Sequence, residues 1–204
     1  MDRDWRLLDV PYHRAEEAAD LLARAFEMDS IIGYIVPPET EDRYKVLKAL
    51  FLDTCLERLA LRQPFLMAEW NNKMVATACV VSTYTPPPTE AMKRTWEKTK
   101  AVIGPGVVSR LEEYEALRKK NMPPRLCHYL LSLGVDPGLR NMGFGRALLD
   151  SVIDVARQDP TSAGVLLDTD ADANLVFYER AGFTLASSAK LGDVNMAYMY
   201  KGVR

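Results

Sequence analysis

Residues 128–157 constrain the fold of this chain more than any other stretch. They begin with a short apolar run, 128–135, which a glycine and a proline bound and which therefore predicts a buried strand. From Phe144 onward, apolar residues recur at helical spacing to the end of the stretch. Gly143 and Gly145 lie at the junction. The stretch therefore predicts a strand, a glycine-bearing turn and the start of a helix.

The turn has a composition suited to binding a phosphate. A helix start presents unpaired N–H groups and a partial positive charge, and glycines let a ligand approach the backbone closely. The pattern Arg140-x-x-Gly143-x-Gly145 differs from the Gly-x-Gly-x-x-Gly of dinucleotide-binding folds and from the Gly-x-x-x-x-Gly-Lys-Ser/Thr loop. Arg146 adds a second positive charge. These features indicate a pyrophosphate cradle, and a turn whose glycines serve only backbone geometry is the alternative.

Composition is typical of a soluble globular protein. The 204 residues are 48% hydrophobic and 26% charged, which suits one domain over 1–204. The net charge of −2 gives no broad attraction to nucleic acid or to an anionic membrane, and we expect neither as a partner. We expect no signal segment and no membrane span. The three cysteines form no CxxC pair, so we expect no metal site, and reduced thiols fit a cytoplasmic location.

Hydrophobic periodicity predicts an α/β chain of alternating elements. Strands are expected at 5–10, 65–70, 74–82, 128–135, 164–169, 183–188 and 194–201, and helices at 13–26, 41–61, 89–103, 107–120, 144–157 and 173–181. Residues 28–38 are expected to form an apolar loop packed on the core, with a wall of a substrate pocket as the alternative. Residues 86–124 are expected to form a helical insertion, because so short a segment rarely folds alone.

A second pattern, Asn174-x-x-x-Tyr178-x-x-x-Gly182-Phe183, lies in the last expected helix and places Asn174 and Tyr178 on one helical face. This pattern and the glycine turn, in this order, resemble the two signatures of the GNAT superfamily of acetyltransferases. The likeness is most distinctive over residues 128–201. The whole layout, with its long second helix and its insertion, is similar to the puromycin N-acetyltransferase type of GNAT protein.

The resemblance implies a mixed, mainly antiparallel sheet of six or seven strands flanked by helices. It also implies acetyl transfer from acetyl-CoA to an amine, without a metal, on an acetyl-CoA-binding core at about 128–182. The central strand and 164–169 would splay apart to admit the pantetheine arm, and Tyr178 would protonate the departing thiolate. A backbone N–H of the central strand would stabilise the oxyanion. The implied cofactor-binding residues are Leu133, Gly134, Val135, Arg140, Asn141, Met142, Gly143, Phe144, Gly145, Arg146, Asn174 and Tyr178.

The residues leave several points open. Candidates for the general base are Asp168, Asp170, Glu69 and His128, although deprotonation through water is also possible, and His128 is expected to be structural. The alternative for Tyr178 is an amphipathic residue of the core. Asp172 is a candidate helix cap.

The acceptor is expected to be a small-molecule amine. A protein or peptide acceptor, another acyl donor, and a non-catalytic CoA-binding regulatory module are the alternatives. The chain is expected to be a monomer or a homodimer.

Overall fold

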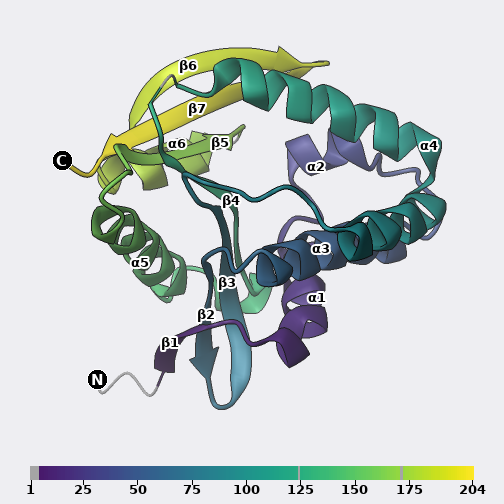
Figure 1. The fold of residues 1–204 in the computed structure, drawn as a ribbon, viewed down its shortest axis with the longest axis horizontal. Helices are drawn as coiled ribbons and strands as arrows, with labels where there is room; N and C mark the ends of the chain where they lie inside the picture. The colour runs from purple at the N-terminus through teal and green to yellow at the C-terminus, as the bar shows by residue number, and fades with distance from the viewer. Residues whose placement is uncertain (1–4, 124, 171) are drawn as a thin grey trace.

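A single seven-stranded sheet runs through the computed structural model, which describes residues 5–123, 125–170 and 172–204 (Figure 1). The strands lie in the order β1-β2-β3-β4-β5-β7-β6. All neighbouring pairs are antiparallel except β4 and β5, which are parallel, so the expected mixed sheet is confirmed. The strands are β1 (Trp5–Asp9), β2 (Phe65–Trp70), β3 (Lys73–Val81), β4 (His128–Val135), β5 (Gly164–Thr169), β6 (Thr184–Leu191) and β7 (Val194–Gly202).

Helices cover both faces of this sheet. They are α1 (Ala15–Ala25), α2 (Ser30–Ile35), α3 (Arg43–Ala60), α4 (Glu90–Asn121), α5 (Phe144–Gln158) and α6 (Asp172–Arg180), with short 3-10 turns at Tyr12–Arg14 and Pro137–Leu139. Alternate strand residues face opposite layers. Tyr129 and Leu166 pack with α1, α2, α3 and α4, whereas Leu130 and Leu167 pack with α5 and α6. The sheet therefore separates two hydrophobic cores.

One expectation about an element is wrong. Residues 28–38 contain the helix α2, because Asp29 caps its first turn by accepting a hydrogen bond from the amide of Ile32 at 3.0 Å. The two helices expected at 89–103 and 107–120 are confirmed as the two arms of α4, which are separated by a bend at Gly104. Gly104 has a φ of +79°, a conformation that favours glycine. In Figure 1 the first arm lies along α3 and the second returns along β6.

The sheet opens between β4 and β5. Within the described chain these strands pair at only two positions, His128 with Val165 and Tyr129 with Leu166. Each strand remains paired on its other side, β4 with β3 and β5 with β7. A bulge at Leu131 bends β4 just beyond the last shared pair. The expected splay of these two strands is therefore confirmed.

The cysteines are small buried residues with free thiols, as expected for Cys55, Cys79 and Cys127. In the described ranges no helix combines the length and apolar character required to cross a bilayer. The same ranges contain no group of three or more metal-ligating side chains.

Candidate active site

The turn between β4 and α5 has the geometry of an anion cradle. Asn141 and Gly143 both have left-handed backbones, with φ of +65° and +93°. Gly143 immediately precedes α5, whose first amides, at 144–146, have no partner within the helix. A Cβ on Gly143 would meet no atom within 4 Å, so the space in front of these amides is open. The glycine-bearing turn expected from the sequence is confirmed, and its shape fits a pyrophosphate.

Gly145 and Gly134 serve close packing. A Cβ on Gly145 would lie 3.3 Å from the Val135 side chain, so glycine lets the helix start rest on β4. A Cβ on Gly134 would lie 2.9 Å from the Leu22 side chain, so this glycine lets α1 press on the opposite face of β4. The absence of a side chain at both positions therefore allows α5 and α1 to pack closely against β4.

The two arginines of the turn already have protein partners. The Arg140 guanidinium donates to the carbonyl of Ala25 at 3.0 Å, which ties the turn to the end of α1. The Arg146 guanidinium lies 3.0 Å from the Asp150 carboxylate, one helical turn away. Both arginine side chains stay exposed at the turn. The cradle therefore exposes the backbone amides at the start of α5, and the side chains of Arg140 and Arg146 lie beside them.

A large cavity begins where β4 and β5 part. It has a volume of about 930 Å³ and is walled by α2, α3, α4, the bulged part of β4 and the start of α6. Ile31 and Ile35 are buried in the core and also line this cavity, so the segment 28–38 packs on the core and forms part of the cavity wall. The insertion supplies another wall along the two arms of α4. Residues 28–38 and the helical insertion at 86–124 therefore both cover this cavity.

Tyr178 and Asn174 reach the cavity from α6. The Tyr178 ring packs edge-on against Phe177 and Phe183, with ring centroids 5.1 and 5.8 Å apart. Burial raises the pKa of the Tyr178 hydroxyl well above its usual value, and nearby carboxylates raise it further. This hydroxyl therefore keeps its proton at neutral pH, as a proton donor must.

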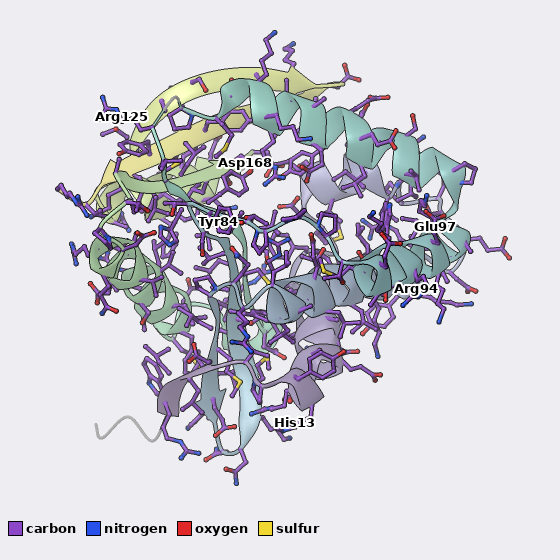
Figure 2. All side chains as sticks on the ribbon, in the orientation of Figure 1. His13, Tyr84, Arg94, Glu97, Arg125 and Asp168 are labelled. Atoms are coloured by element: carbon purple, nitrogen blue, oxygen red, sulfur yellow. The ribbon has the colours of Figure 1, made fainter. Side chains whose placement is uncertain are left out.

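Asp168 lines the cavity from β5, between the sheet and the second arm of α4 (Figure 2). The Tyr114 hydroxyl lies 3.2 Å and 3.3 Å from its two oxygens. Burial raises the pKa of Asp168 to about 7, against the lowering effects of the Tyr114 hydrogen bond and of Arg118. A carboxyl with this pKa is present in both protonation states near neutral pH, which suits a general base.

Asp29 places a second carboxyl on the cavity wall. Burial raises the pKa of Asp29 to about 6, although its cap bond to Ile32 lowers it and the charge of Asp170 raises it. The charge of Asp29 also raises the pKa of Asp168. This end of the cavity therefore favours a positively charged group.

The remaining candidate bases lie elsewhere. Glu69 is bound by the guanidinium groups of Arg6 and Arg14, which lower its pKa, and it is absent from the described cavity wall. Asp170 lies just beyond β5, with one buried oxygen that lacks a hydrogen-bond partner among the described residues. Asp172 is the first residue of α6, so it lies inside the helix that it was a candidate to cap.

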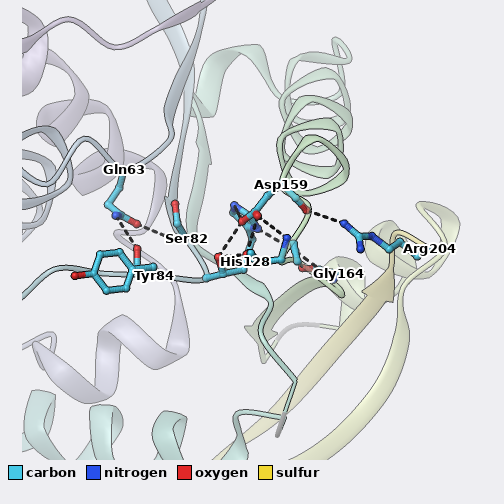
Figure 3. A network of polar contacts seen from close by, with 10 residues as sticks. Gln63, Ser82, Tyr84, His128, Asp159, Gly164 and Arg204 are labelled. Atoms are coloured by element: carbon cyan, nitrogen blue, oxygen red, sulfur yellow. Dashed lines mark hydrogen bonds and ion pairs between the residues drawn. The ribbon is translucent and has the colours of Figure 1, made fainter.

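His128 belongs to a polar network outside the cavity (Figure 3). Its Nδ1 lies 3.1 Å from the Ser162 hydroxyl, and its Nε2 lies 3.8 Å from the Asp159 carboxylate. Burial lowers the pKa of His128. The Asp159 carboxylate also accepts from Thr83, so the network joins β4 to the segment that follows β3. The geometry agrees with the structural role expected for this histidine.

Sequence reasoning missed Asp29, Tyr114 and Arg118. Tyr114 and Arg118 do share one helical face, which spacing alone shows. Nothing in that spacing says that the face meets Asp168, because the contact depends on the bend of α4 at Gly104. Asp29 precedes an apolar run as a cap residue does, and recognising that signal would have identified α2.

Residues 16–183 match the family model of the acetyltransferase (GNAT) family. Similar solved structures include that of histone acetyltransferase HPA2 and related acetyltransferase from Corynebacterium glutamicum, 18% identical with a TM-score of 0.70 over 98% of this chain and 97% of that one. A Drosophila melanogaster polyamine N-acetyltransferase that forms N-acetylagmatine is 18% identical, with a TM-score of 0.63 over 98% and 100%. The yncA protein from Salmonella typhimurium, solved with its cofactor acetyl-CoA, is 15% identical, with a TM-score of 0.60 over 99% and 95%.

At these identities the solved structures show the shared fold, and the family model, which spans most of the chain, shows the family. The closer likeness to the puromycin type stays a prediction. The chain belongs to the GNAT family and is an N-acetyltransferase that uses acetyl-CoA as its acyl donor.

Proposed function

We propose that this enzyme acetylates the amine of a small molecule, with Asp168 as general base and Tyr178 as general acid. One observation carries the proposal: both side chains line a single cavity that begins where β4 and β5 part. Burial raises the pKa of Asp168 to about 7 and keeps Tyr178 protonated. The cavity therefore contains one group that can accept a proton near neutral pH and one that carries a proton to donate.

We propose that the donor lies along β4 and ends at the cradle. Acetyl-CoA supplies an acetyl group already activated as a thioester. The open edge of β4 at Leu133 and Val135 can pair with the amides of the pantetheine arm, because β3 occupies only the other edge. The amides of 144–146 and the flanking Arg140 and Arg146 would hold the pyrophosphate. Asn174, which lines the cavity, would lie beside the arm.

The chemistry follows from the charges of the chain itself. An amine must lose its proton before it can attack a thioester carbonyl, and the Asp168 carboxylate accepts that proton. A main-chain N–H on the open edge of β4 stabilises the negative charge that develops on the carbonyl oxygen. The Tyr178 hydroxyl donates its proton to the sulfur as the thiolate departs. The product leaves with the acetyl group on nitrogen.

The cavity supports a small acceptor rather than a protein. Two helices, α2 and α4, wall it, whereas a polypeptide substrate requires an open groove. Within the described chain, Asp29, Asp53 and Asp168 line it without an ion-pair partner and offer carboxyl groups to an ammonium group, whereas Arg118 and Lys119 line it from α4. A non-catalytic CoA-binding module would require neither Asp168 nor Tyr178 at the gap.

The test measures acetyl-CoA turnover with a panel of acceptors, and the release of the free thiol of CoA is the readout. The panel would hold small diamines, agmatine, aminoglycosides and a lysine-containing peptide. We expect turnover of at least one small amine and none of the peptide. Asp168→Asn should lower kcat/KM by about 10²–10⁴-fold, the usual contribution of a positioned base. Peptide turnover alone would favour the protein-acetylating alternative, and full activity of Asp168→Asn would exclude Asp168 as the base.

A further inference from the structure

The insertion helix reaches the proposed base directly. The Tyr114 hydroxyl, on the second arm of α4, lies 3.2 Å and 3.3 Å from the two Asp168 oxygens and 3.4 Å from the Tyr129 hydroxyl. Tyr114 is 8% exposed, so bulk water has little access to this contact. A phenol donates preferentially to an ionised carboxylate, since charge-assisted hydrogen bonds are the stronger ones. The single Tyr114 proton therefore goes to Asp168.

We infer that Tyr114 is a positioning residue that orients the Asp168 carboxylate and lowers its proton affinity into the working range of the enzyme. The inference rests on the proposed role of Asp168 as base. It gives α4 a second task besides walling the cavity. The kinked insertion would then be a necessary part of the catalytic centre.

Other charged and titratable groups face Asp168 from each neighbouring element. On α4, Arg118 lowers the pKa of Asp168 and Glu115 raises it, and Asp29 on α2 also raises it. Tyr178 on α6 and Tyr198 on β7 also lie near Asp168, and their hydroxyls stay neutral because burial raises their pKa values. Burial is the largest influence and raises the pKa of Asp168. Tyr114 and Arg118 are thus the two groups that oppose burial.

Arg118 is itself held firmly beside this cluster. Its guanidinium is paired with Glu115 and lies 4.9 Å above the ring centroid of Tyr129. Glu115 partly neutralises the charge of Arg118. The hydrogen bond from Tyr114 is a direct contact with Asp168, and it favours the ionised form of that carboxyl. Removing one hydroxyl should therefore shift the titration without moving the surrounding charges.

Tyr198 offers a matched control. It lies opposite Asp168 in the β5–β7 ladder and is fully buried. Its hydroxyl has no hydrogen-bond partner among the described residues, in contrast to that of Tyr114. Tyr198→Phe and Tyr114→Phe therefore remove the same atom from the same neighbourhood, and only the second removes a hydrogen bond to Asp168.

The experiment is a carboxyl titration of the enzyme labelled with ¹³C-aspartate, followed by NMR, with Asp168→Asn to assign the signal. It requires no acceptor. We expect Tyr114→Phe to raise the Asp168 midpoint by about one pH unit, and Tyr198→Phe to leave it within a few tenths of a unit. An unmoved midpoint in a folded Tyr114→Phe variant, or equal shifts in both variants, overturns the inference. Phenylalanine keeps the buried ring, and circular dichroism checks the fold.

Kinetics separate this inference from the proposed function. With an acceptor from the panel, the acidic limb of the kcat/KM profile should move up with the NMR midpoint in Tyr114→Phe, so that activity recovers at high pH. A loss that is equal at every pH would mean a merely structural tyrosine. If Asp168→Asn stays fully active, the base assignment itself is wrong. If Asp168→Asn is inactive while Tyr114→Phe has an unmoved profile, only the positioning role is wrong.

Discussion

The proposed acetyl-CoA site, or donor side, and the cavity proposed to bind the acceptor, or acceptor side, are built from different materials. The donor side is contiguous backbone, in which the end of β4, the glycine turn and the first amides of α5 follow one another. The acceptor side is made of side chains, with Asp29, Tyr114 and Asp168 brought together from three distant elements. A contiguous backbone site depends on local geometry, so it leaves a local sequence pattern. A dispersed side-chain site depends on how whole elements pack.

Tyr178 lines the cavity from α6, and its loss should give a large effect. We expect Tyr178→Phe to lower kcat by about 10²–10³-fold, because a positioned proton donor contributes on this scale. The rise in melting temperature on adding acetyl-CoA should persist, since the cradle is untouched. Tyr200→Phe is the control, because it removes a hydroxyl that donates to the carbonyl of Ala163. Equal losses in both variants would mean that Tyr178 is structural.

Gly143→Glu should disable the donor side alone. Acetyl-CoA at about a hundred times its dissociation constant stabilises by about 2.7 kcal/mol, a rise of about 5–10 °C for a chain of this size. We expect that rise in the wild type and in Gly106→Glu, whose Cβ would make an ordinary contact 3.8 Å from the Arg110 guanidinium on α4. It should disappear in Gly143→Glu, where a negative charge faces the amides. A rise retained in Gly143→Glu would place the pyrophosphate elsewhere.

The buried carboxyl of Asp168 should lower the stability of the folded protein at neutral and higher pH. Its pKa in the folded chain, about 7, exceeds its ordinary 3.8, so the folded state holds a proton that the unfolded state releases. The contribution of Asp168 to stability is then greatest below about pH 4 and falls as pH rises towards 7. Asn cannot ionise, so Asp168→Asn should be more stable than the wild type at pH 8, by about 1–3 kcal/mol, and equal to it near pH 4. Urea unfolding at both values tests the sign.

The contrast between the two sides limited what the sequence could predict. The strand, the turn and α5 were predicted closely, because apolar periodicity and glycine placement are local signals. The mixed sheet followed from the family resemblance, and Asp168 was one of four candidate bases. Choosing among them required knowing that Glu69 binds two arginines and that His128 lies outside the cavity. Both facts are set by long-range packing.

Gly104 tests how far the acceptor side depends on the bend in α4. A Cβ there would meet nothing within 4 Å, so any cost of Gly104→Ala is backbone strain at a φ of +79°, about 1–3 kcal/mol. Gly106→Ala is the matched control and should be neutral or slightly stabilising. We expect Gly104→Ala to raise KM for the acceptor while the acetyl-CoA response is unchanged. Equal stability of the two variants would contradict a strained hinge.

Glu69 should give the smallest effect. This residue lies on β2, two strands away from β4, where Arg6 and Arg14 bind its carboxylate, and it is absent from the described cavity wall. We expect Glu69→Gln to leave kcat/KM within about twofold of the wild type, as for a substitution remote from the site. A loss comparable to that of Asp168→Asn, with the fold intact by circular dichroism, would restore Glu69 as a candidate base.

The two-pair ladder between β4 and β5 also affects how rigid the sheet is. Beyond His128 and Tyr129 the sheet is in effect two leaves, one of β1–β4 and one of β5–β7. A ligand whose amides form hydrogen bonds with the open edge of β4 would occupy the position of a further strand. Amide hydrogen exchange along 131–135 would then report donor binding directly, as solvent-exchanging groups become protected. If acetyl-CoA binds along β4 as proposed, the cosubstrate completes the secondary structure of the enzyme that uses it.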